Sequence, residues 1–84
     1  AYTVTEIRLQ VAQYPVGDTV HSILVAEPGG SLREVHVFRQ LTRDSEWLIY
    51  MPEPPLANVQ VVRIYTAVSP SWVAWREVQV FGEP

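Results

Sequence analysis

Apolar and polar residues alternate along several stretches of this chain, which is the pattern of a β-strand with one buried face. Residues 3–11 are the clearest case, since the charged and amide side chains of Glu6, Arg8 and Gln10 share one face. The other face carries Thr5, Ile7, Leu9 and Val11. This stretch therefore predicts a strand with one side against a core and one side in water.

Five further stretches have strand character and predict strands over 20–26, 32–41, 47–51, 59–68 and 76–81. Residues rich in proline, glycine and polar side chains separate them at 12–19, 27–31, 42–46, 52–58 and 68–75. Pro52, Pro54 and Pro55 lack the amide hydrogen that a ladder needs, so 52–58 is expected to be an extended crossing. No stretch keeps a helical period.

These strands predict an all-β fold, an antiparallel β-sandwich or partial jelly roll of about six strands. With 84 residues the chain forms one domain, residues 1–84. The side chains expected to point inward are Ile7, Leu9, Ile23, Val25, Val35, Val37, Val62, Ile64, Val78 and Val80.

Composition narrows the function classes. Hydrophobic residues make up 48% and charged residues 18%, which suits a folded domain. The net charge is −3 and no basic patch occurs, so nucleic acid is not an expected partner. The chain has no cysteine, which excludes disulfides and thiolate metal sites. Its apolar runs are too short for a membrane-spanning helix.

Catalytic chemistry has no visible pattern in the sequence. His21 and His36 each lie on a predicted strand, with no carboxylate at a spacing that suggests a triad or a metal site. We expect His36 to face solvent and His21 to be partly buried with its ring nitrogens hydrogen-bonded. Glycine-rich phosphate loops and nucleophile elbows are absent as well. The sequence therefore predicts a protein that is not an enzyme.

The turns sort into two ends if successive strands run in opposite directions. One end collects residues 12–19, 42–46 and 68–75, and the other collects 27–31 and 52–58. The first end combines aromatic, charged and hydroxyl side chains, as sugar sites do, because a ring stacks on C–H groups while polar groups bond the hydroxyls. The expected ligand-binding residues are Tyr14, Asp18, Arg43 and Trp72.

Three passages carry a resemblance to a known family. Residues 69–82 read SPSWVAWREVQVFG and resemble the closing segment of discoidin domains, also called coagulation-factor C-type domains. PPL at 54–56 followed by VVRI at 61–64, and GDTVH at 17–21, are similar to further passages of that family. Each motif is short, and the specificity comes from their order and spacing over nearly the whole chain.

The resemblance implies a galactose-binding-like jelly roll outside the cell or on its surface, a non-catalytic module that binds carbohydrate at the end holding residues 13–18. It implies that the tryptophan matching Trp72 packs beneath the loops, which makes Tyr14 the better contact candidate. It also implies calcium as a cofactor to which Glu77 contributes; the alternative is that Glu77 is exposed or pairs with an arginine.

Phospholipid is the ligand of the blood-clotting relatives, which insert apolar loop tips beside basic residues. The matching tip here, residues 14–18, is weakly apolar and acidic. Phospholipid is therefore not expected to be a partner of this chain.

The chain departs from the discoidin pattern at its beginning, where the family has a leading segment with an extra strand. It is expected to be either the later part of a domain or a reduced version of one, and in both cases a sheet edge is exposed. Exposed edges recruit other strands. The alternative function is therefore a structural module that forms homo-oligomers through its sheet edges. The competing possibility is that the strands close on themselves, plugged by Trp47, Trp72 and Trp75.

Overall fold

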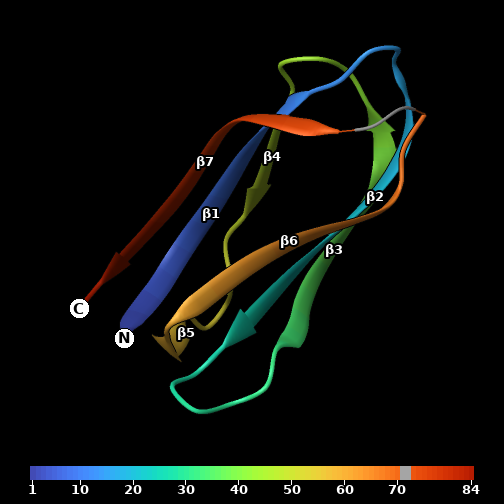
Figure 1. Ribbon diagram of the computed structural model, residues 1–84. Helices are drawn as coiled ribbons and strands as arrows, with labels where there is room; N and C mark the ends of the chain where they lie inside the picture. Colours follow the sequence, from blue (N-terminus) through green and yellow to red (C-terminus); the bar gives the residue numbers. More distant parts are fainter. Residues whose placement is uncertain (71–72) are drawn as a thin grey trace.

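The computed structural model describes residues 1–70 and 73–84 as two antiparallel sheets packed face to face (Figure 1). The predicted all-β sandwich is confirmed. Seven strands are present in the described residues, and their bounds are β1 Tyr2–Ala12, β2 Gly17–Ala26, β3 Arg33–Thr42, β4 Trp47–Tyr50, β5 Leu56–Val59, β6 Val61–Val68 and β7 Ala74–Glu83.

Strand β1 is the centre of one sheet, here called the β1 sheet. Strand β7 pairs with it from Thr3 to Ala12. The short strands β4 and β5 lie one after the other along its opposite side, where β4 pairs with Ile7 to Gln10 and β5 pairs with Tyr2 and Val4. The second sheet, the β2 sheet, has the order β3-β2-β6. Its central strand β2 pairs with both neighbours over most of its length.

Strand β5 was not expected, since residues 52–58 were predicted to be a crossing. The prolines do end before it, at Pro55. The four residues that follow form a short strand at the edge of the β1 sheet, where proline-flanked strands are tolerated because few ladder bonds are needed. The observed fold therefore has one strand more than the sequence predicts.

The core lies between the two sheets and is built on one row of β1 side chains. Ile7, Leu9 and Val11 have no exposed surface, and Val4 is nearly as buried. The row faces Ile23 and Val25 of β2, and three other strands complete the cluster with Phe38, Leu48 and Val59. Among the predicted inward residues Ile7, Leu9, Ile23 and Val25 are thus buried, and Val35, Val62 and Ile64 pack half-buried against them.

The inward prediction for Val37 is wrong. Val37 pairs with Ser22, which lies between the inward residues of β2, so its side chain points to the outer face. The ladder shifts between Ile23 and Leu24, and this bulge leaves Val35 free to pack against the core. Phe38 fills the inward position instead. The alternation of apolar and polar residues cannot reveal a bulge. The extra residue reverses which face the side chains on one side of it occupy, relative to those on the other side.

The expectation that His36 faces solvent is also wrong, because His36 pairs with the inward residue Ile23 next to this bulge. The His36 ring is half-buried and stacks on the Tyr50 ring with centroids 4.5 Å apart and an interplanar angle of 15°. It also meets the Phe38 ring edge to face at 4.5 Å. His36 therefore joins β3 to β4 where the two sheets meet, and burial lowers the pKa of its imidazole.

A second bulge changes the face of Thr5. Val4 pairs with Gly82 and Glu6 pairs with Phe81, so Thr5 is the extra residue between two ladder positions. Its hydroxyl donates a hydrogen bond to the Phe81 carbonyl oxygen at 3.2 Å and is exposed. Val4 takes the inward place that the alternation had given to Thr5.

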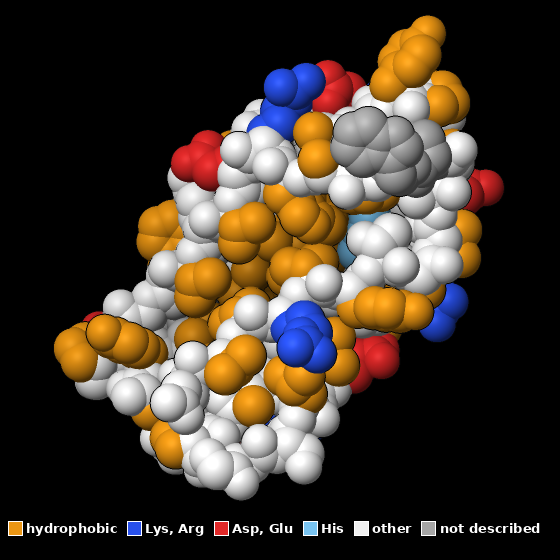
Figure 2. Space-filling model, in the orientation of Figure 1, with side chains coloured by type: hydrophobic (Ala, Val, Ile, Leu, Met, Phe, Trp, Pro, Cys, Tyr) orange, Lys and Arg blue, Asp and Glu red, His pale blue; other side chains and the backbone are white. Residues whose placement is uncertain are grey.

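The expectation that Val78 and Val80 are buried is also wrong, although their direction is as predicted. Val78 pairs with Leu9 and Val80 pairs with Ile7, so both share the inner face with core residues. Each is nevertheless 46% exposed. The facing β2 sheet ends at β6 and does not cover β7, and the surface is hollowed and lined by hydrophobic side chains there (Figure 2).

Gly82 is required by close backbone approach between β7 and β1. A Cβ at this position would lie 2.2 Å from the Thr3 carbonyl oxygen, which is a rigid backbone atom. We predict that Gly82→Ala lowers the free energy of unfolding by about 1–3 kcal/mol, the usual cost of overpacking. Urea unfolding measures it, with Gly30→Ala as the matched control, since a Cβ at Gly30 has its nearest contact at 3.4 Å. Equal stability of the two variants would contradict the pairing of Gly82 with Val4.

Candidate binding site at the loop end

Three connections meet at one end of the sandwich: residues 13–16, residues 43–46, and the described part of the β6–β7 connection (Figure 1). The Gln13 amide donates a hydrogen bond to the Asp44 carboxylate at 3.0 Å, which joins the first two loops. Gly17 approaches the third so closely that a Cβ there would lie 2.8 Å from Cγ of Pro70. The loops gather as the antiparallel alternation predicts.

The β3–β4 loop is fixed by backbone hydrogen bonds on both of its sides. The Glu46 amide donates to the Arg43 carbonyl oxygen at 3.2 Å, and the Glu46 carboxylate accepts from the Arg43 amide at 3.1 Å. Ser45, with φ of 67°, donates from its amide to the Val11 carbonyl oxygen at 2.7 Å. The loop is therefore bound to the end of β1, and its residues are held on a rigid base.

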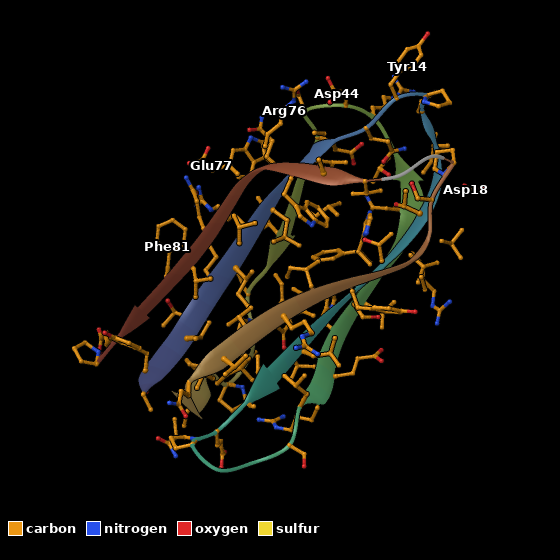
Figure 3. All side chains as sticks on the ribbon, viewed as in Figure 1. Tyr14, Asp18, Asp44, Arg76, Glu77 and Phe81 are labelled. Atoms are coloured by element: carbon orange, nitrogen blue, oxygen red, sulfur yellow. The ribbon has the colours of Figure 1, made fainter. Side chains whose placement is uncertain are left out.

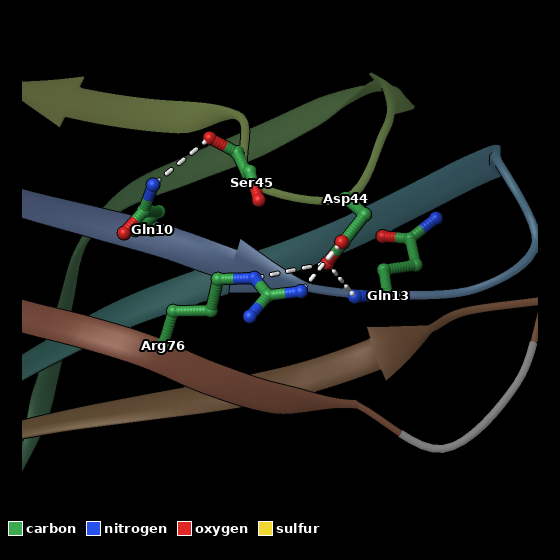
Figure 4. A network of polar contacts seen from close by, with 5 residues as sticks. All are labelled: Gln10, Gln13, Asp44, Ser45 and Arg76. Carbon is green, nitrogen blue, oxygen red and sulfur yellow. Dashed lines mark hydrogen bonds and ion pairs between the residues drawn. The ribbon is translucent and has the colours of Figure 1, made fainter.

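Asp44 and Arg76 form the ion pair that links this loop to β7 (Figure 4). Arg76 donates from Nη2 to one carboxylate oxygen at 2.6 Å and from Nε to the other at 3.2 Å. The hydrogen bonds from Arg76, followed by the one from the Gln13 amide, hold the pKa of Asp44 below its usual value. The same contact raises the pKa of Arg76.

A buried polar cluster supports the loops from below. The Gln13 side-chain amide donates to the carbonyl oxygens of Thr42 and Pro15, both at 3.1 Å, and its oxygen accepts from the Thr42 hydroxyl at 2.9 Å. The Thr42 and Thr19 hydroxyl oxygens lie 2.7 Å apart. All three side chains are buried, so each bond forms away from competing water. The cluster fixes where residues 13–16 leave the sandwich.

Three of the four predicted ligand-binding residues lie at this end of the molecule: Tyr14 and Asp18, which Figure 3 labels, and Arg43 in the connection 43–46. Tyr14 is at the tip of its loop with 88% of its surface exposed. Asp18 is the second residue of β2 and Arg43 follows β3; both are exposed, and neither joins an ion pair within residues 1–70 and 73–84. The fourth, Trp72, lies outside the described residues. Their role in binding stays a prediction.

His21 lies between the sheets below the loop end and has no exposed surface. Its Nδ1 is 2.8 Å from the Thr66 hydroxyl, and its ring meets the Trp75 ring edge to face with centroids 4.9 Å apart. Nε2 is buried and has no hydrogen-bond partner among residues 1–70 and 73–84, so the expectation that both ring nitrogens are bonded is wrong there. Burial lowers the pKa of His21, because it disfavours the charged imidazolium.

Glu77 lies on the outer face of β7 opposite Gln10, where its carboxylate accepts a hydrogen bond from the Gln79 side chain at 2.7 Å. Within the described part of the chain, no group of three or more histidine, aspartate or glutamate side chains could hold a metal ion. Calcium needs six or more oxygen ligands. Glu77 alone therefore gives no basis for a metal centre, and calcium stays a prediction from the resemblance.

The sequence missed the residues that hold the site together. Gln13 and Thr42 fall in the predicted turns 12–19 and 42–46, and Arg76 is the first residue of the predicted strand 76–81, with no role assigned to any of them. Arg76 meets Asp44 only because β7 pairs with β1, to whose end the Asp44 loop is also bound. The sequence holds no signal for this pair, because Asp44 stands beside Arg43 and Arg76 stands beside Glu77.

Comparison of the chain with known protein families, curated proteins and solved structures finds no match. The likeness to discoidin domains therefore rests on the sequence motifs alone. In residues 1–70 and 73–84 there is no helix of the length and apolar character that crossing a membrane would need.

We predict that Asp44→Asn destabilises the protein at neutral pH and has little effect in strong acid. The folded-state pKa of Asp44 is lowered, so its contribution is present above the pKa of the unfolded chain and is lost as the pH falls through the folded value. Melting temperatures from about pH 7 to about pH 2 measure this. Asp18→Asn is the matched control, because Asp18 is an exposed carboxylate at the same end that forms no ion pair with any residue the structure describes. A gap between Asp44→Asn and the parent protein that stays constant with pH would contradict this role.

Proposed function

We propose that this chain is a non-catalytic binding module whose loop end takes carbohydrate. The observation that carries the proposal is Tyr14, an aromatic side chain 88% exposed at the tip of a loop whose base is held by buried hydrogen bonds. An apolar ring presented to water on a rigid base is suited to stack on the C–H face of a sugar.

Charged groups at the same end provide the polar half of such a site. The Arg43 guanidinium has several donors and the Asp18 carboxylate accepts only, so together they match hydroxyl groups that both donate and accept. Since neither is engaged in an ion pair within the described residues, both are available to a ligand. Asp44, next to Arg43 in the same loop, is neutralised by Arg76, and this ion pair holds the loop.

The rigid base supports binding for an energetic reason. A loop that is already ordered loses little conformational entropy when a ligand docks. Gln13 anchors the loop that carries Tyr14 through a hydrogen bond of 3.1 Å to the Thr42 carbonyl oxygen. Ser45 anchors the loop that carries Arg43 through a hydrogen bond of 2.7 Å to the Val11 carbonyl oxygen. The resemblance to discoidin domains supports the same end as the ligand side, because the matching loop of that family is residues 13–18.

We predict that Tyr14→Ala and Arg43→Ala each weaken glycan binding by about 1–2 kcal/mol while the melting temperature stays nearly unchanged. Both side chains are exposed, so their removal leaves the core intact. A glycan array on the parent protein selects the ligand, and calorimetric titration then compares the variants.

Tyr65→Ala is the control, since Tyr65 is a 60% exposed tyrosine on the outer face of β6, away from the loop end. It should bind like the parent protein. Repeating the titration with calcium and with a chelator tests whether a metal takes part. Normal binding by both Tyr14→Ala and Arg43→Ala would overturn the site, and an array without any bound glycan would overturn the ligand class.

A second candidate function, self-assembly through exposed sheet edges, is favoured by a different observation. Val78 and Val80 lie on the inner face of the β1 sheet beside Leu9 and Ile7, yet nearly half of each is exposed. A core face left in water is a surface that another chain stabilises by covering it.

A further inference from the structure

The sandwich is open along the side between β7 and β6. Strand β7 presents Val78 and Val80 on the inner face, each 46% exposed, and β6 presents the half-buried Val62 and Ile64 across from them. Figure 2 looks onto this side and shows hydrophobic side chains gathered in a hollow between the two strands. The opening runs along the strands and is separate from the loop end.

From Glu77 to Gly82 the free edge of β7 has no bulge of its own; the one bulge in β7 lies at Arg76, near its start, where Gln10 pairs with Glu77 and Val11 pairs with Trp75. Bulges, short length, proline and inward-pointing charges are features that usually prevent strand pairing. Strands β4 and β5 have four residues each, and prolines stand between them at 52, 54 and 55. Strand β7 has ten residues and no proline, and its inner face carries valines. Among the described strands it pairs with β1 alone, so its other side offers unpaired backbone groups.

We propose that β7 pairs antiparallel with β7 of a second copy, around a two-fold axis that passes through Gln79. This proposal rests on the second candidate function above and specifies its interface. The two β1 sheets then form one continuous sheet, and the inner faces of both copies lie on the same side of it. The pairing is isologous, so it closes at two copies.

The sequence of β7 favours this register. With Gln79 opposite itself, Val78 lies opposite Val80 of the other copy, and the four valines form one apolar row. Glu77 lies opposite Phe81, so no like charges face each other. A shift to a centre on Glu77 would oppose two glutamates, and a centre on Val80 would place Glu77 opposite Glu83. A centre on Val78 would leave Val80 opposite Arg76.

The dimensions suit a stable dimer. The molecule measures 37 × 21 × 19 Å, and a ten-residue strand spans about 33 Å, nearly the whole long axis. A side of that length and width has an area of about 700–800 Å², which is the upper limit of what a second copy can cover there and is of the size that each partner of a stable interface typically buries. The open side is therefore large enough for a second copy.

We predict that the protein has twice its 9.5 kDa chain mass in light scattering at high concentration, and that Val78→Lys shifts it toward the single-chain mass. A lysine in the valine row would place charge between the two copies. Val61→Lys is the matched control, a valine that is 42% exposed on the outer face of β6. It should keep the parent mass.

A cysteine placed on the axis tests the register directly, since the chain has no cysteine of its own. Residues directly opposite in an antiparallel pair have Cα atoms about 4.5–5.5 Å apart, within the range that a disulfide spans. We predict that Gln79→Cys forms a disulfide-linked dimer under mild oxidation. Glu77→Cys should not, because in this register the two Glu77 positions are about 13 Å apart.

Each outcome decides the proposal. A two-chain mass with selective cross-linking of Gln79→Cys supports it. A single-chain mass at every concentration overturns both this pairing and the self-assembly function. Larger assemblies, or equal cross-linking at both cysteine positions, overturn the β7 pairing while leaving self-assembly standing. Glycan binding at the loop end is independent of all three results.

Discussion

The structure depends on the pairing of β1. This strand lies at the centre of its sheet and pairs with β4 and β5 on one side and with β7 on the other. Its inward row of Val4, Ile7, Leu9 and Val11 is almost fully buried and is the largest contribution of any strand to the core. In a domain of this size the buried apolar area is small, so one such row carries much of the stability.

The same strand also positions the loop end. Val11 and Gln13 exchange hydrogen bonds with the β3–β4 loop, and β7, paired along β1, places Arg76 beside Asp44. Segments more than thirty residues apart are thereby held within hydrogen-bond distance. The loop that carries the exposed Tyr14 leaves from this hydrogen-bonded end of β1, so the proposed ligand-binding end is held in place by the sheet.

The two sheets differ in their number of strands, and this difference leaves an apolar surface exposed along β7. The β1 sheet has four strands and the β2 sheet has three, and the two do not overlap fully along β7. Val78 and Val80 have the same sequence pattern and the same face as buried residues but remain half in water. One end of the sandwich thus presents polar and aromatic loops, and one side presents an apolar strand.

The sequence alone determined the period-two pattern, the turns and therefore the antiparallel sandwich, because alternation and turn residues are local properties of the chain. It also indicated which loops share an end. Tertiary structure decided everything that depends on neighbours: the bulges that exchanged Val4 for Thr5 and Phe38 for Val37, the Asp44–Arg76 pair, and the exposure of Val78 and Val80. Whether a side chain is buried depends on what packs opposite it. The sequence of β7 holds no information about where the facing sheet ends, which is at β6.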